Sequence, residues 1–193
     1  MIFARSERLV LRAPVDEDLE PLLTSWSDPD TVKYTSEREN LRGFLKQLIA
    51  DMQVKAPGGQ DPGGPWFQYV VERTEDGAVV GDLGAGFFVP GERQVELGYR
   101  ILPVHRRQGY AKEALAALIC HLIEAHDIHR FVGVAASINA PSIAVLRSLG
   151  FRHEGQFRQS FLCNGAWLDD DYFALLASEW DSGGRSSMVL ANK

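Results

Sequence analysis

The chain has 193 residues, of which 45% are hydrophobic and 24% charged, enough for one sizeable core and typical of a single folded domain. The formal net charge of −6 argues against nucleic-acid binding, which normally needs a basic face, and suits a cationic or amine substrate. No apolar run approaches the roughly 20 residues that span a bilayer, and the two cysteines lack the spacing of a disulfide framework or zinc site. We therefore expect a cytoplasmic protein that does not insert into a membrane, with one domain over residues 1–181 and a flexible tail over 182–193.

The first third of the chain predicts a strand, two helices and a loop. Residues 8–12 alternate leucines with charged neighbours, which is the period of a half-buried strand, and residues 16–26 form an amphipathic helical stretch. Asp28-Pro29-Asp30 breaks that helix, and residues 37–52 place apolar side chains along one face of a second helix. Residues 56–65 are too rich in glycine and proline for a regular element, so they form either a binding loop or an ordinary surface loop.

The middle of the chain predicts an antiparallel meander followed by a crossover. Residues 67–73, 79–89 and 94–102 read as strands, because short apolar runs are separated by tight turns. Residues 109–125 form an amphipathic helix, and residues 131–135 form a short apolar strand. Such a crossover makes its two strands parallel neighbours, so the helix begins at the carboxyl ends of the strands.

The last third predicts one helix and a hairpin. Residues 141–149 form the helix, with Asn139 as a possible N-cap and Gly150 at its end. Residues 154–162 and 167–177 read as strands joined through Asn164-Gly165, a strong hairpin pattern.

The run from Arg106 to Ala111 carries the most chemical information. A strand ends there and a helix begins, so the unpaired amides of the first helical turn point outward at the positive end of the helix dipole, where a phosphate fits. Arg106 and Arg107 add cationic donors, and Gly109 permits close backbone approach. The glycine by itself leaves tight packing of helix on sheet as the other explanation.

This run resembles the GCN5-related N-acetyltransferase (GNAT) superfamily, whose pyrophosphate-binding motif is Q/R-x-x-G-x-G/A. The residues Arg106-Arg107-Gln108-Gly109-Tyr110-Ala111 match every specified position. Asn139-Ala140-Pro141-Ser142 and Leu149-Gly150-Phe151 follow at the distance typical of the family. The opening Ser6–Arg12 and the run Glu96–Tyr99 resemble the RimJ/RimL-like branch, and the similarity extends from Ser6 to Trp180.

The resemblance implies an α/β (α+β) fold with a single domain. It implies a mixed, mostly antiparallel sheet of about seven strands flanked by helices, with a V-shaped splay between the fourth and fifth strands. Acetyl-CoA is then the co-substrate, and its pantetheine arm pairs with the exposed strand edge at residues 94–102. The implied cofactor-binding residues are Ile101, Leu102, Arg106, Arg107, Gln108, Gly109, Tyr110, Ala111, Asn139 and Ser142.

The resemblance to this family makes two residues candidates for proton transfer. The attacking amine must be uncharged, and Glu96, on the strand that lines the gap, is the candidate base, unless it is a surface or salt-bridging glutamate. Many family members protonate the leaving thiolate with a tyrosine, but Leu146 occupies that position here. By resemblance to the RimJ/RimL-like branch, Ser142 takes the role, unless it is only an N-terminal helix serine, just as Asn139 is either a cofactor ligand or only a helix cap.

The sequence gives least information about the identity of the acceptor. Tyr99, Trp66 and Phe67 either line an acceptor pocket or belong to the core. The histidines lack the spacing of a zinc site, so we expect no metal. The predicted activity is acetyl transfer to a primary amine, either a protein N-terminus or a small molecule, and the alternative is a catalytically silent acyl-CoA-binding regulatory module. A homodimer through the C-terminal strands is possible by analogy.

Overall fold

One sheet of eight strands organises the residues that the computed structural model describes, which are 1–35, 37–57, 66–88 and 93–180. The strands are β1 (Ile2–Arg5), β2 (Leu9–Arg12), β3 (Trp66–Arg73), β4 (Val79–Gly86), β5 (Gln94–Ile101), β6 (Arg130–Ala136), β7 (Arg152–Cys163) and β8 (Ala166–Leu176). The helices are α1 (Leu19–Trp26), α2 (Pro29–Val32), α3 (Leu41–Val54), α4 (Tyr110–His126), α5 (Ala140–Ser148) and α6 (Ala177–Trp180), with short 3-10 turns η1 (Asp16–Asp18) and η2 (Pro103–His105).

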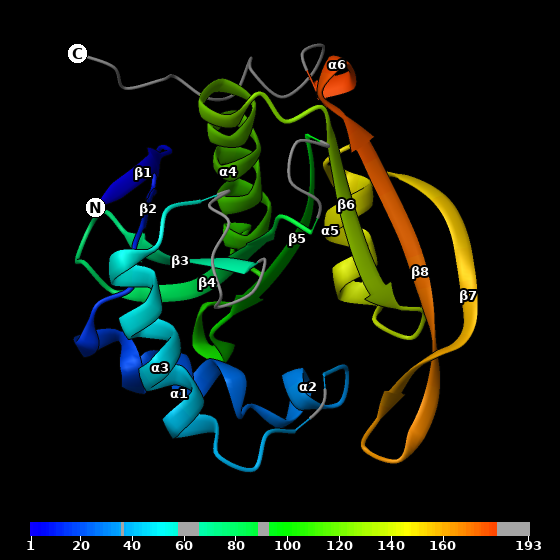
Figure 1. Cartoon of the computed structure of the whole chain (residues 1–193), viewed down its shortest axis with the longest axis horizontal. Helices are drawn as coiled ribbons and strands as arrows, with labels where there is room; N and C mark the ends of the chain where they lie inside the picture. The colour runs from blue at the N-terminus through cyan, green and yellow to red at the C-terminus, as the bar shows by residue number, and fades with distance from the viewer. Residues whose placement is uncertain (36, 58–65, 89–92, 181–193) are drawn as a thin grey trace.

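The strand order is β1-β2-β3-β4-β5-β6-β8-β7, and only the β5–β6 pair is parallel within the described residues (Figure 1). The alternation of strand side chains sends Phe67, Tyr69 and Leu83 to the face that α4 covers, where they are fully buried. Gln68 points to the other face, and there Leu22 of α1 and Leu45 of α3 form a second, smaller core. Among the described helices, none is long and apolar enough to cross a bilayer.

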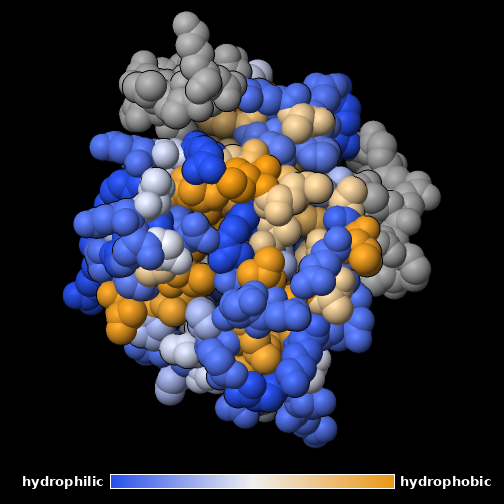
Figure 2. All heavy atoms as spheres, turned by 90° about the vertical axis from the view of Figure 1, so that its left-hand side faces the viewer, coloured by the Kyte–Doolittle hydropathy of each residue, from blue (hydrophilic) through white to orange (hydrophobic). Residues whose placement is uncertain are grey.

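The edge of the sheet at β1 carries a mixed surface. Ile2 is 51% exposed, although β1 pairs along its length with β2. Figure 2 shows the face at the left of Figure 1, where apolar residues gather in groups that hydrophilic residues border. Exposed apolar side chains are normal on a folded domain, because apolar atoms make up a large part of its surface.

The parallel strands β5 and β6 pair over a short distance and then separate. Their partners are Gln94 with Arg130, Val95 with Phe131, and Glu96 with Val132. Beyond Glu96, β5 continues to Ile101 without a partner on this side, so its backbone amides and carbonyls face the gap. The expected V-shaped splay between the fourth and fifth predicted strands is therefore confirmed, as the gap between β5 and β6.

Several sequence-based boundaries need correction. The sheet has eight strands rather than about seven, because the four-residue β1, whose pairing with β2 contains a bulge, was not predicted. The second predicted helix begins at Leu41, four residues late, because the side chain of Asn40 caps it. The predicted break at residues 28–30 is confirmed, since α1 ends at Trp26, but the same residues also open the short helix α2, which was not predicted, with Asp28 as N-cap and Pro29 in its first turn. Most of the glycine-rich stretch 56–65 and the whole tail 182–193 lie outside the described residues.

Candidate active site

A cleft with a volume of about 1110 Å³ opens where β5 and β6 separate. Its walls come from α1, α2 and α3 on one side and from α5 and β6 on the other, and the first turn of α4 closes one end. Residues of β3, β4 and β5 form its floor. The cleft therefore joins the unpaired edge of β5 to the start of a long helix, two features that the sequence placed together.

The backbone before α4 forms a cradle of amide groups. Arg107 has φ 61° and Gly109 has φ 81°, so two residues of the turn adopt left-handed conformations. Within the described residues, the backbone N–H groups from Arg107 to Lys112 have no hydrogen-bond acceptor. Unpaired amides in a concave turn at a helix N-terminus bind anions, and a diphosphate is the right size for several of them.

Arg8 holds this cradle in place from a distant part of the sequence. Its guanidinium pairs with Glu113 in the first turn of α4 at 2.6 Å, donates to the Gln108 carbonyl at 3.1 Å, and lies 4.6 Å from the centre of the Tyr110 ring. Sequence reasoning did not find this role, because Arg8 belongs to the segment that leads into β2 and nothing near it in the chain suggests a partner on α4.

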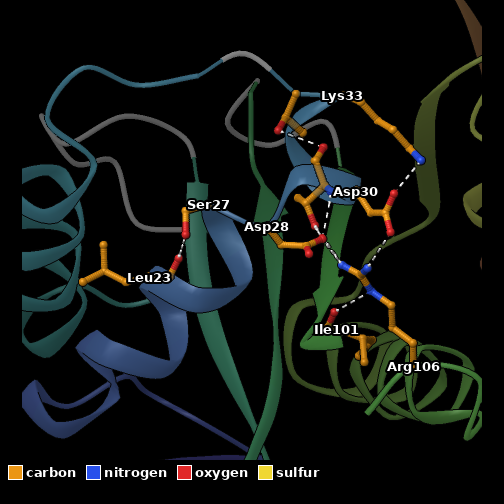
Figure 3. A network of polar contacts seen from close by, with 9 residues as sticks. Leu23, Ser27, Asp28, Asp30, Lys33, Ile101 and Arg106 are labelled. Carbon is orange, nitrogen blue, oxygen red and sulfur yellow. Dashed lines mark hydrogen bonds and ion pairs between the residues drawn. The ribbon is translucent and has the colours of Figure 1, made fainter. Parts of the chain in front are cut away.

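The side chain of Arg106 connects the cradle to α2. Its Nη2 donates to Asp28 Oδ2 at 2.5 Å and to Thr31 Oγ1 at 3.1 Å, and its Nε donates to the Ile101 carbonyl at 3.2 Å. Asp30 lies 3.8 Å from Nη1 and also pairs with Lys33 (Figure 3). The guanidinium group of Arg106, which the sequence predicted to bind phosphate, thus forms ion pairs with two carboxylates, although Arg106 lines the cleft.

Tyr99, Ser142 and Asn139 form a connected polar group where α5 meets β5. The Tyr99 hydroxyl lies 2.7 Å from Ser142 Oγ and 2.9 Å from the Ser142 carbonyl oxygen. Asn139 Oδ1 accepts from the Ser142 amide at 3.2 Å, so Asn139 is the helix cap that the sequence suggested. Burial raises the pKa of Tyr99 to about 12, opposed by its hydrogen bond with Ser142, so the phenol stays protonated at neutral pH. The sequence offered Tyr99 only as a wall of the acceptor pocket and missed its contact with Ser142.

Glu96 lies at the point where β5 leaves β6. It forms the last parallel pair, with Val132, and it is half-buried. Burial raises the pKa of its carboxyl, and the negative charge of Asp170 on β8 raises it further. Glu96 is not among the residues that line the cleft, but Leu97 and Gly98 next to it are.

The structure separates the remaining predicted residues into two groups. Tyr99, Trp66, Ile101, Arg107, Gly109, Tyr110, Ala111, Asn139 and Ser142 line the cleft. Phe67 does not: it is 0% exposed and packs against Phe3 and Tyr69 with ring centres 5.3 and 4.8 Å away, so its assignment to the acceptor pocket is wrong. Leu102 and Gln108 also lie outside the lining of the cleft. Leu102 is 8% exposed, and the side-chain amide of Gln108 donates to the Val104 carbonyl.

Leu146, at the position where many family members carry a tyrosine, is a core residue. It is 1% exposed and packs over Gly133 of β6, where an added Cβ would lie 2.7 Å from one of its methyl carbons. His121 and His126 have rings 5.6 Å apart on α4, and burial lowers the pKa of both. In the part of the chain that the structure describes, no group of three metal-ligating side chains is present.

The fold and this cleft define an acetyltransferase domain. The family described as "Acetyltransferase (GNAT) domain" matches residues 8–152, and the chain belongs to this family. The match covers the amide cradle, the unpaired edge of β5 and the Asn139–Ser142 cap.

Individual relatives agree with this assignment. The chain is 28% identical over 171 residues to the uncharacterized N-acetyltransferase YoaA of Bacillus subtilis, which covers 89% of this chain and 94% of YoaA. It is 33% identical over 87 residues to the [ribosomal protein uS5]-alanine N-acetyltransferase of Escherichia coli, 45% of each chain. Mycobacterium smegmatis RimJ, solved in complex with CoA-disulfide, has the same fold with a TM-score of 0.79 and 24% identity, over 93% of this chain and 87% of RimJ. The resemblance to the RimJ/RimL-like branch is thereby confirmed.

Proposed function

We propose that the protein transfers an acetyl group from acetyl-CoA to a primary amine, by direct attack of the amine on the thioester while both substrates are bound. The observation that carries the proposal is the amide cradle at Arg107–Lys112, set at the end of the unpaired edge of β5. A diphosphate held by these amides leaves the pantetheine arm free to extend along β5 toward Glu96. RimJ, which has this fold, was solved with a CoA disulfide, and this supports the choice of a CoA thioester as the acetyl donor.

In this proposal Glu96 removes a proton from the attacking ammonium, directly or through a water molecule. Its carboxyl has a raised pKa, which brings a general base nearer to the working pH and strengthens the base in its ionised form. Backbone N–H groups of β5 beyond Glu96 stabilise the oxyanion that forms at the thioester carbonyl oxygen when the amine adds to its carbon.

Ser142 then protonates the leaving thiolate. Its hydroxyl contacts the Tyr99 hydroxyl at 2.7 Å, so a proton given up by Ser142 is replaced through this contact from the phenol, which at once regains a proton from solvent. With Leu146 buried in the tyrosine position, these two hydroxyls are the proton donors that the cleft offers beside α5. Asn139, which uses its carbonyl oxygen for the cap, retains its amide N–H groups to donate to the pantetheine or to the thioester end.

The acceptor is a protein N-terminus or a small-molecule amine. The E. coli relative's name gives an alanine of ribosomal protein uS5 as its acceptor. A cytoplasmic location and a homodimer through β7 and β8 stay predictions.

The test is thiol release from acetyl-CoA in the presence of a panel of amines and N-terminal peptides. We expect turnover with at least one acceptor, and we expect the Glu96→Gln variant to bind acetyl-CoA normally while its turnover falls about 10²- to 10⁴-fold. Glu75→Gln, an exposed glutamate in the β3–β4 turn, is the matched control and should keep full turnover. Binding of acetyl-CoA without turnover of any acceptor would favour the second candidate, a silent acyl-CoA-binding regulatory module, to which Leu146 and the position of Glu96 outside the cleft lining also point.

A further inference from the structure

Two of the arginines that line the cleft each lie over an aromatic ring. Arg100 Cζ is 3.7 Å from the ring centre of Trp26, and Arg38 Cζ is 4.1 Å from that of Phe44. The two rings contact each other, with centres 5.6 Å apart, and all four residues line the cleft. We call these four residues the arginine–aromatic cluster. Stacking on a ring fixes the plane of a guanidinium while leaving its N–H edge available for an anion.

The donors of this cluster are only partly used by the protein. Within the described residues, the one ion pair of Arg100 is with Asp82 at 3.4 Å, compared with 2.5 Å between Arg106 and Asp28. The buried Asp82 carboxylate also accepts from Gln68 and Trp26, so Arg100 does not hold it alone. Each guanidinium has five N–H groups, and most of those on Arg100 have no acceptor in the described part of the chain.

Arg38 is still less engaged, and the acidic groups nearby are occupied. Among the described residues, its contact with the Phe44 ring is the only interaction of the Arg38 side chain. The carboxylates that line the cleft are Asp30, paired with Lys33 at 2.8 Å, and Asp51, which accepts from Gln47 at 2.7 Å. Gln47 is neutral, so Asp51 keeps its negative charge, but in the described part of the chain no carboxylate pairs with Arg38, and Asp82 uses only part of Arg100. The cluster therefore presents the charge of Arg38 and the remaining N–H groups of Arg100 to the cleft.

The cluster lies on the same face of the sheet as the proposed base. Glu96, Gly98 and Arg100 alternate onto one face of β5. Gly98 has no side chain, and the Trp66 ring covers it, 3.6 Å from where a Cβ would be. Glu96 and Arg100 are four positions apart on β5, which corresponds to about 13 Å between their Cα atoms, and both side chains are long. A flexible molecule lying across Trp66 can thus reach Glu96 with one end and Arg100 with the other.

We infer that Arg38 and Arg100 form an anion subsite, and that the acceptor is a primary amine that also carries a carboxylate or phosphate group. This inference rests on the proposed acetyltransferase function and names the class of acceptor for it. The amine end lies at Glu96 and Asp170, which favour a cation, and the anionic end lies at the arginine–aromatic cluster. A polyamine places a second cation against two guanidinium groups and is disfavoured.

The test compares acceptors that differ only in the anionic group. Matched pairs are an ω-amino acid with its amide and a dipeptide with its C-terminal amide; an aminoalkyl phosphate and a diamine complete the set. With the wild-type protein, kcat/KM for each anionic member should exceed that of its amide by about 10- to 100-fold, as expected for charge-assisted hydrogen bonds. The carboxylate and phosphate arms identify which anion is preferred.

Variants of Arg38 and Arg100 test whether these two residues cause the preference for anionic acceptors. Arg38→Gln and Arg100→Lys should lower kcat/KM for the anionic acceptors about tenfold or more, hardly change it for the amides, and leave acetyl-CoA affinity unchanged. Arg42→Gln, which removes an exposed arginine paired with Glu20, is the control and should keep the full preference. Arg100 touches the buried Asp82, so its variant is compared by melting temperature, whereas the exposed Arg38 carries no such risk to folding.

Equal kcat/KM for each acid and its amide, equal losses for both in the variants, or weaker acetyl-CoA binding in the variants would overturn the inference. Should no acceptor support thiol release, the proposed function fails, and calorimetry still tests the subsite. In that case the wild type in the presence of CoA should bind the ω-amino acid more tightly than its amide, and Arg38→Gln should abolish the difference; equal binding would refute the subsite.

Discussion

Replacing Asp28 with asparagine removes one negative charge from the contact that joins α2 to the segment before α4. Asparagine caps helices about as well as aspartate, and the Thr31 amide and Arg106 donate to the same oxygen, Asp28 Oδ2, so the cap survives and the pairing with Arg106 loses its ionic character. Asp28 is 13% exposed and Arg106 is 31% exposed, so the pair lies between a surface and a buried ion pair. A hydrogen bond between charged groups contributes about 1.5–3 kcal/mol when buried, and partial exposure reduces this to about 1–2 kcal/mol.

For a chain of this size, each 1 kcal/mol lowers the melting temperature by about 2–4 °C, so Asp28→Asn should melt about 2–8 °C below the wild type. Asp28→Ala loses the cap as well, about 1 kcal/mol more, and should melt about 4–12 °C below the wild type. Because α2 supplies Asp30 and Thr31 to the cleft wall, both variants should raise KM for the acceptor several-fold while acetyl-CoA affinity stays close to that of the wild type.

Scanning calorimetry and steady-state kinetics measure the two effects. Asp30→Asn is the control, because Asp30 is 69% exposed and lies 3.8 Å from Arg106, so this variant should melt with the wild type. If Asp28→Asn and Asp30→Asn melt together, or if Asp28→Asn weakens acetyl-CoA binding as much as acceptor binding, then Arg106 does not serve chiefly to hold α2.

Three further predictions concern the cradle, the proton donor Tyr99 and the proposed base Glu96. Gly109→Ala forces a side chain into a left-handed turn at a cost of about 1–2 kcal/mol, so acetyl-CoA should bind about 5- to 30-fold more weakly, whereas Gly77→Ala, with φ +72° in a turn with open space around it, should lose stability but keep its affinity. Tyr99→Phe removes the contacts with Ser142 and should lower kcat about tenfold or more with acetyl-CoA affinity retained; an unchanged kcat would exclude Tyr99 from proton transfer. Glu96 acts as a base only when ionised, and its pKa is raised by burial and by Asp170, so kcat/KM should rise with pH through that pKa. Asp170→Asn removes a negative charge, lowers the pKa of Glu96 and should move this rise to lower pH, and an unmoved pH profile would contradict the assignment of Glu96 as the base.

The sequence by itself determined the features that depend on nearby residues. The cradle at Arg107–Lys112 consists of backbone amides, and a strand end, a glycine and a helix start within a few residues are sufficient to produce it. The same holds for the cap at Asn139 and for the parallel pairing of β5 with β6, because a crossover through α4 makes the two strands parallel neighbours. The splay beyond that pairing was implied by the resemblance to the GNAT superfamily and not by the local pattern. The short strand β1 and the short helix α2 were missed because four residues give too little periodicity to recognise.

The tertiary structure alone decided which side chains meet and which face of each strand is buried. A period of two shows that Trp66 and Phe67 point to opposite faces of β3, so both could not line the acceptor pocket, but it does not say which face α4 covers. The structure decided that Trp66 lines the cleft and that Phe67 is buried in the core. The pairing of Arg8 with Glu113, of Arg106 with Asp28 and of Tyr99 with Ser142 joins residues 105, 78 and 43 positions apart. Contacts at such separations depend on how the helices pack on the sheet, because the local sequence around each residue does not fix its distant partner.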